Sequence, residues 1–135
     1  MMTKYLVLIS CFMAGALQAN EVDCNKDSNT YQMNECAKQK MATADNQLEL
    51  YFTKAKQKYK QDPKLVDKLV LEQQAWITYR KAHCDAVSQK WAGGTIAGVI
   101  YGKCIISMTK ERTHLIWESY LTSMDSTPAL LAEPK

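Results

Sequence analysis

Apolar side chains recur every three or four residues over three long stretches of this chain, which is the spacing of helices that bury one face. The first stretch covers residues 29–61, the second begins at Pro63 and ends near Trp91, and the third covers residues 96–122. In the first stretch the apolar positions are Met33, Cys36 or Ala37, Met41, Ala44, Leu48, Tyr51 or Phe52, Ala55 and Tyr59. The pattern therefore predicts three helices.

Residues suited to helix caps stand at the start of the first two stretches. Asn29 is expected to cap the first helix, with Gln32 three residues later bonding back to the cap. Asp62 suits the N-cap of the second helix, and Pro63 suits its first position, where no backbone donor is missed.

Gly93 and Gly94 separate the second stretch from the third, and paired glycines end a helix. Thr95 is expected to cap the helix that follows. Helices joined by connections this short pack side by side in opposite directions. The predicted fold class is therefore an all-α, antiparallel three-helix bundle.

The N-terminal residues have the pattern of an export signal. Lys4 gives a positive start, residues 5–17 form an apolar run, and Ala19 is a small residue before a cut. A cut after Ala16 is the alternative, and Cys11 ends a sequence that looks like a lipoprotein box, with too short an apolar stretch before it. The run is also shorter than the ~20 residues of a membrane-spanning helix.

Length and composition indicate one domain, because the chain has 135 residues of which 47% are hydrophobic. We expect residues 1–19 to be a signal peptide, residues 20–122 to form the helical domain, and residues 123–135 to be a flexible C-terminal tail. The protein is then periplasmic or secreted.

Four cysteines remain after the signal is removed, because residues 1–19 hold one of the five. An even number in a small exported chain predicts two disulfides. Cys84 and Cys104 are each ten residues from Gly94, so they should face each other across the helical hairpin. That leaves Cys24 to pair with Cys36, and the crossed pairings stay open.

The same counting of residues from the turns places polar side chains at one height of the bundle. Gln73, Trp76 and Arg80 share one stripe of the second helix. We expect an Asp45–Arg80 ion pair and stacking of Arg112 on Trp76 or Tyr79. The expected polar core layer consists of Asp45, Trp76, Tyr79, Arg80, Thr109 and Arg112.

No motif for catalysis, metal or cofactor is found. His83 and His114 are too far apart to share a level, and the cysteines are used in disulfides, so no metal site and no catalytic residue is predicted. There is no phosphate loop or nucleotide fingerprint, and no cofactor is expected. The formal charge of +3, or +2 once Lys4 is removed, argues against nucleic acid as a partner.

The predicted loop between the second and third helices is the candidate partner-binding site. It contains Trp91, Gly93, Gly94 and Thr95. Tryptophan is enriched at binding hot spots, and loops at the tips of hairpins are exposed. The alternative is that Trp91 only closes the end of the core.

A combination of these motifs resembles a known family. The motifs are Met33-Asn34-Glu35-Cys36-Ala37, Ala44-Asp45 with Leu48 and Tyr51, Gln74-x-Trp76-x-x-Tyr79-Arg80-x-x-x-Cys84, Gly93-Gly94-Thr95, and Cys104 followed by Thr109-x-x-Arg112-x-x-Leu115. Over residues 24–116 the chain is similar to the LprI-like lysozyme inhibitor N-terminal domain family, also called DUF1311.

The resemblance implies an exported, non-enzymatic helical protein of the bacterial envelope that binds and inhibits a lysozyme-type glycosidase. The alternative is a periplasmic binding or immunity module with a different protein partner and no effect on lysozyme. No inhibitory motif of the family is carried over to particular residues.

Overall fold

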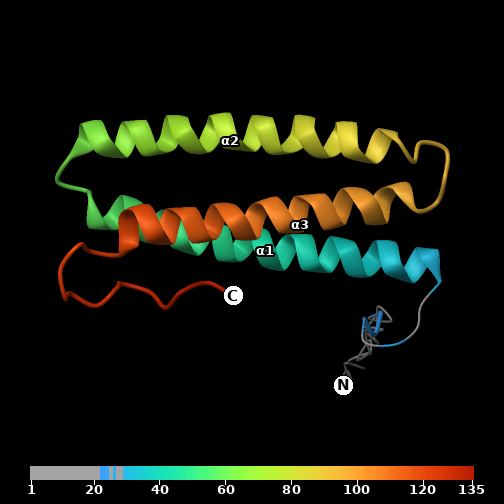
Figure 1. Cartoon of the computed structure of the whole chain (residues 1–135), viewed down its shortest axis with the longest axis horizontal. Helices are drawn as coiled ribbons and strands as arrows, with labels where there is room; N and C mark the ends of the chain where they lie inside the picture. Colours follow the sequence, from blue (N-terminus) through green and yellow to red (C-terminus); the bar gives the residue numbers. More distant parts are fainter. Residues whose placement is uncertain (1–21, 25, 27–28) are drawn as a thin grey trace, which may run out of the picture.

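The chain folds into a bundle of three antiparallel helices (Figure 1). The computed structural model describes residues 22–24, 26 and 29–135. Helix α1 is Thr30–Lys58, α2 is Pro63–Gln89, α3 is Ala97–Ile116, and a short π-helix, η1, covers Trp117–Leu121. Within the described residues there is no strand, so the predicted all-α bundle is confirmed. The predicted signal peptide and Cys11 lie outside the described residues.

The capping residues predicted for α1 and α2 act as expected. The Asn29 side chain accepts a hydrogen bond from the Gln32 amide at 3.0 Å, and the Gln32 side chain accepts one from the Asn29 amide at 3.1 Å. At the start of α2, the Asp62 carboxylate accepts from the Leu65 amide at 3.1 Å. The ends differ slightly: α1 ends at Lys58 and not Gln61, because Tyr59 leaves the helical conformation.

The start of α3 differs from the prediction, because Thr95 is not its N-cap. The N-cap is Ile96, and no side chain bonds to the first amides of the helix. Ile96 has φ −78° and ψ −17°, which is helical backbone, whereas a capping side chain needs an extended residue. The carbonyl of Thr95 instead accepts a hydrogen bond from Asn34 Nδ2 at 3.1 Å.

The predicted third helix changes its winding after Ile116. In η1 the amide of Thr122 donates to the carbonyl of Trp117 at 3.1 Å, which is the i→i+5 bond of a π-helix. Continued α-helix would turn Leu121 about 140° away from Ile116. The wider turn brings both side chains into the core, where Ile116 is 0% and Leu121 is 1% exposed.

Helix α3 is the central element, since it packs against both α1 and α2. It approaches α1 closely at Gly102, where a Cβ atom would lie 2.7 Å from Ala37 Cβ. The main buried cluster lies toward the α1–α2 turn and consists of Leu48, Tyr51, Phe52, Ala55, Leu69, Ile116 and Leu121. Helix α2 is less buried than the others, and Figure 1 shows it set apart from the α1–α3 pair.

Both predicted disulfides are present. Cys24 is bonded to Cys36 and Cys84 to Cys104, each with a Cα–Cα distance of 5.6 Å. The first joins the N-terminal leader to α1, and the second joins α2 to α3 near the loop end of the hairpin. Counting residues from Gly94 therefore gave the correct register of these two helices.

Residues 123–135, the predicted flexible tail, make up the C-terminal segment. It has no helix after Leu121, but it returns along α1 and α3 (Figure 1). The Tyr51 hydroxyl donates to the carbonyl of Ala132 at 2.8 Å, and Trp117 Nε1 donates to the carbonyl of Leu131 at 2.9 Å. These bonds satisfy two polar groups that lie in an otherwise apolar surface, which explains why the segment stays on the bundle.

Candidate functional site

Arg80 joins all three helices at the middle of the bundle. Its Nη1 donates to Asp45 Oδ1 of α1 at 2.5 Å and to Thr109 Oγ1 of α3 at 2.6 Å. Its guanidinium carbon also lies 4.7 Å from the centre of the Trp76 ring. The Arg80 side chain is 15% exposed and that of Asp45 is 47% exposed, so the pair lies at the edge of the core.

Arg112 is the most deeply buried charge among the described residues, with a side chain that is 3% exposed. Its Nη1 donates to Glu72 Oε1 at 2.6 Å and its Nε donates to Gln73 Oε1 at 3.0 Å. The guanidinium carbon lies 5.9 Å from the centre of the Trp76 ring, on which Arg80 also packs. Nη2 of Arg112 is buried without a hydrogen-bond partner.

Glu72 links Arg112 to η1, because its second oxygen accepts a hydrogen bond from the Tyr120 hydroxyl at 2.9 Å. Burial alone would raise the pKa of Glu72, but the hydrogen bonds from Arg112 and Tyr120 outweigh it and lower that pKa below 4.5. Burial and the bond to Glu72 raise the pKa of Tyr120 above 10.0. The contact therefore favours a charged carboxylate and a neutral phenol.

The structure brings five of the six residues of the expected polar layer together and leaves out the sixth, Tyr79. Tyr79 is 59% exposed, and its ring lies 5.8 Å from that of His83. It comes one residue before Arg80, so it projects about 100° around the helix from that side chain. Glu72 and Gln73, which are not in the predicted layer, supply the hydrogen-bond acceptors for Arg112.

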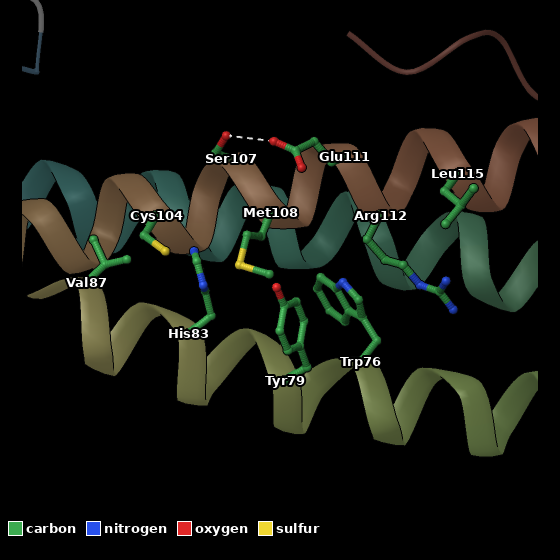
Figure 2. Close-up of a pocket in the computed structure, with 10 residues that line it drawn as sticks. All are labelled: Trp76, Tyr79, His83, Val87, Cys104, Ser107, Met108, Glu111, Arg112 and Leu115. Carbon is green, nitrogen blue, oxygen red and sulfur yellow. Dashed lines mark hydrogen bonds between the residues drawn. The ribbon is translucent and has the colours of Figure 1, made fainter.

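A groove of about 530 Å³ runs between α2 and α3 beside this layer (Figure 2). Trp76, Tyr79 and His83 reach into it from α2, and Met108 and Cys104 reach into it from α3. The complete lining is Trp76, Tyr79, His83, Val87, Cys104, Ser107, Met108, Glu111, Arg112 and Leu115. The groove thus combines aromatic and apolar side chains with the polar groups of Ser107, Glu111 and Arg112.

The groove has few groups suited to catalysis. Cys104 is held in a disulfide, so it offers no thiolate nucleophile. The Ser107 hydroxyl donates to Glu111 Oε1 at 3.0 Å within α3, and no hydrogen bond joins it to His83. A nucleophile activated by a base would need that bond. In the described part of the chain, no three His, Cys, Asp or Glu side chains gather as a metal site.

The α2–α3 loop is held by several backbone hydrogen bonds. The amide of Trp91 donates to Ser88 at 2.9 Å, that of Gly94 to Trp91 at 3.1 Å, and that of Ala97 to Gly94 at 3.2 Å. Gly93 has φ +81°, a conformation that favours glycine. The Asn34 side chain ties the loop to α1 through Thr95, and Trp91 is 50% exposed.

The contacts that sequence reasoning missed are those of Glu72, Tyr120 and Asn34. Glu72 lies beside the apolar stripe of α2, and its spacing from Arg112 is not a local helical one. The predicted stripe of the second helix includes Gln73. A partner for the buried Arg112 could therefore be expected at Gln73 or at its neighbour Glu72. No pattern in the sequence indicates that Asn34 bonds to Thr95.

The fold and these sites define a small, disulfide-linked helical protein with an exposed, hydrogen-bonded loop and a buried arginine layer. In the described residues no helix has the length and apolar character that a membrane span requires. The chain belongs to the family described as lysozyme inhibitor LprI, which matches residues 23–115.

The chain is also similar to a bacterial protein. The chain is 27% identical over 118 residues to an uncharacterized protein of Rhizobium meliloti (strain 1021), which covers 79% of this chain and 85% of that protein. No solved structure matches the chain.

Proposed function

We propose that this protein is exported to the bacterial envelope, where it binds and inhibits a lysozyme-type glycosidase without catalysing a reaction itself. The observation that carries the proposal is the family match over residues 23–115, which spans all three helices and both disulfides. The signal-like start of the sequence and the disulfides support an oxidising compartment.

The α2–α3 loop is the contact element in this proposal. It forms the convex tip of a helical hairpin, and its backbone bonds and the Asn34 contact fix its shape before binding. A preformed loop loses little conformational entropy when it binds, and an exposed tryptophan supplies a large contact area. Trp91 is therefore the anchor residue that we propose.

The target site would be a substrate cleft with paired carboxylates, as glycosidases have. Lys90 is exposed and directly precedes Trp91, so it places a positive charge at the same tip. An inhibitor with this tip would fill the cleft with the tryptophan and neutralise a carboxylate with the lysine. No step of this inhibition requires a reactive group in the α2–α3 groove.

The test is to mix the purified oxidised protein with lysozymes of several structural types and to follow the lysis of cell walls. We expect one type to be inhibited at micromolar protein, and Trp91→Ala to weaken that inhibition at least tenfold. Leu71→Ala is the matched control, because Leu71 is 58% exposed on α2 and lies about 30 Å along the helix from Trp91.

No inhibition of any lysozyme type at micromolar excess would overturn the proposal. Equal loss of inhibition in Trp91→Ala and Leu71→Ala would keep the function but move the contact away from the loop. Stable binding of a different envelope protein, with no effect on lysis, would favour the alternative of a binding or immunity module.

A further inference from the structure

A second groove, between α1 and α3, is lined by lysines. It consists of two neighbouring cavities of about 180 and 500 Å³ that share Lys40 and Ile106. The smaller is lined by Cys24, Met33, Cys36, Ala37, Lys40, Val99, Lys103 and Ile106, and the larger by Lys40, Thr43, Ala44, Gln47, Ile106, Lys110 and Lys135. We call the two cavities together the basic groove.

The charge of the basic groove is not balanced within the described structure. No acidic side chain is among its lining residues, and Lys40, Lys103 and Lys110 are all exposed. No ion pair or hydrogen bond to their ammonium groups is found, whereas Lys38 and Lys81 each contact a carboxylate. Lys103 and Lys110 are seven residues apart, about 10 Å along α3. The groove therefore presents a row of unpaired cations.

The floor of the basic groove is apolar. Met33 and Ala37 of α1 line it together with Val99 and Ile106 of α3. Lysines along both sides of an apolar floor favour a ligand that carries anionic and apolar groups together. A polyanion without apolar groups would leave the floor uncovered.

The C-terminal tail shows what shape of ligand fits between α1 and α3. Its residues run without helix along the same side of the two helices, held by Tyr51 and Trp117 at the carbonyls of Ala132 and Leu131. Tyr51 lies one turn beyond Gln47, and Trp117, the first residue of η1, lies two turns beyond Lys110 of α3. Lys135 then lines the larger cavity. The basic groove thus lies next to a surface of the bundle on which non-helical chain is already bound.

We propose that the basic groove binds an extended acidic segment of a partner protein, with acidic residues alternating with apolar ones. In extended chain, successive side chains point to opposite sides, so apolar residues would contact the floor while acidic residues reach the lysines. This site is separate from the α2–α3 loop and does not depend on the proposed inhibition of a lysozyme.

The first experiment measures binding of a fluorescent eight-residue peptide of alternating Glu and Leu to the full-length oxidised protein by anisotropy. We expect saturable binding that weakens about tenfold when salt is raised, because exposed charges are screened. Lys40→Gln with Lys110→Gln should weaken binding at least tenfold. The control pair is Lys64→Gln with Lys68→Gln, which are exposed lysines of α2 outside the groove.

The second experiment separates a peptide groove from a simple positive patch. Ile106→Asn should weaken peptide binding about tenfold, and Leu50→Asn, an exposed apolar residue of α1, should not. Circular dichroism checks that each variant is folded. Two outcomes would overturn the proposal in favour of a general anion-binding surface. One is that the two pairs of lysine substitutions weaken binding equally. The other is that heparin displaces the peptide and its own binding is unaffected by Ile106→Asn.

Discussion

Arg80 of α2 donates a hydrogen bond to Asp45 of α1 with Nη1 and Oδ1 2.5 Å apart. In the described part of the chain, no other side-chain hydrogen bond runs directly between these two helices. Since Arg80 also bonds to Thr109, one guanidinium positions α2 against both of its neighbours.

Arg80→Ala is expected to reduce the free energy of unfolding by about 1.5–3 kcal/mol, the range for hydrogen bonds to charged groups. The effect stays below that of a fully buried pair because Asp45 is 47% exposed. The melting temperature of the oxidised protein should fall by several degrees. Lys81→Ala is the control, since its pair with Asp85 is exposed and contributes little; equal melting of the two variants would contradict this role of Arg80.

Gly102→Ala should destabilise the α1–α3 contact, because the added Cβ would lie 2.7 Å from Ala37 Cβ. Overpacking of this kind costs about 1–3 kcal/mol. This cost is measured by chemical denaturation of Gly102→Ala, of Ala37→Gly and of the double variant. The double variant should be more stable than the sum of the two single effects predicts, and strict additivity would show that the two sites do not touch.

Unfolding should depend on pH through the Glu72–Tyr120 contact. The folded pKa of Glu72 is lowered, so its contribution is fully present above the unfolded pKa and is lost as pH falls through the folded value. The folded pKa of Tyr120 is raised, so its contribution is present below pH 10.0 and is lost as pH rises through the folded value. Urea titrations at acidic and at alkaline pH measure the free energy of unfolding, and so give the acidic and the alkaline limb of its pH dependence.

The variants that test this pH dependence act on separate limbs. Glu72→Gln should flatten the acidic limb, and Tyr120→Phe should flatten the alkaline one. An alkaline limb that is unchanged in Tyr120→Phe would mean that other groups cause it. Because Glu72 is partly exposed, we expect salt to reduce the slope of unfolding free energy against pH in the acidic range.

The C-terminal segment should be protected by its hydrogen bonds to the bundle. Tyr51→Phe removes the bond to Ala132 and is expected to cost about 1 kcal/mol. Limited proteolysis of residues 122–135 should be faster in this variant than in the parent. Tyr31→Phe serves as the control, since Tyr31 is 71% exposed at the other end of α1. Cleavage at equal rates would indicate that the tail is not held by Tyr51.

Local signals in the sequence were sufficient for the helices and the disulfides. Asn29 with Gln32, and Asp62 with Pro63, mark helix starts by bonds that span only a few residues. Cys84 and Cys104 could be paired because antiparallel helices fix the heights of residues on either side of a turn.

The remaining features depend on packing between distant residues. The π-helix forms because Leu121 must reach the core, and the tail bends back because Tyr51 and Trp117 need acceptors. Glu72 and Arg112 are 40 residues apart, so nothing local pairs them. Threonine is a residue type that often caps helices, yet the Thr95 side chain caps none. Its carbonyl instead accepts a hydrogen bond from Asn34.

Helix α2 buries only Leu69, Gln73 and Cys84, and it is fixed at one end by the Asp62–Pro63 turn and near the other by the Cys84 bridge. If a reductant cut that bridge, α2 would lose its covalent tie to α3 beside the loop, while the hydrogen bonds of Arg80 and Arg112 to their partners on the other helices would remain. The bridge therefore makes the stability of the hairpin that carries Trp91 sensitive to reducing conditions, because cutting a disulfide raises the conformational entropy of the unfolded chain.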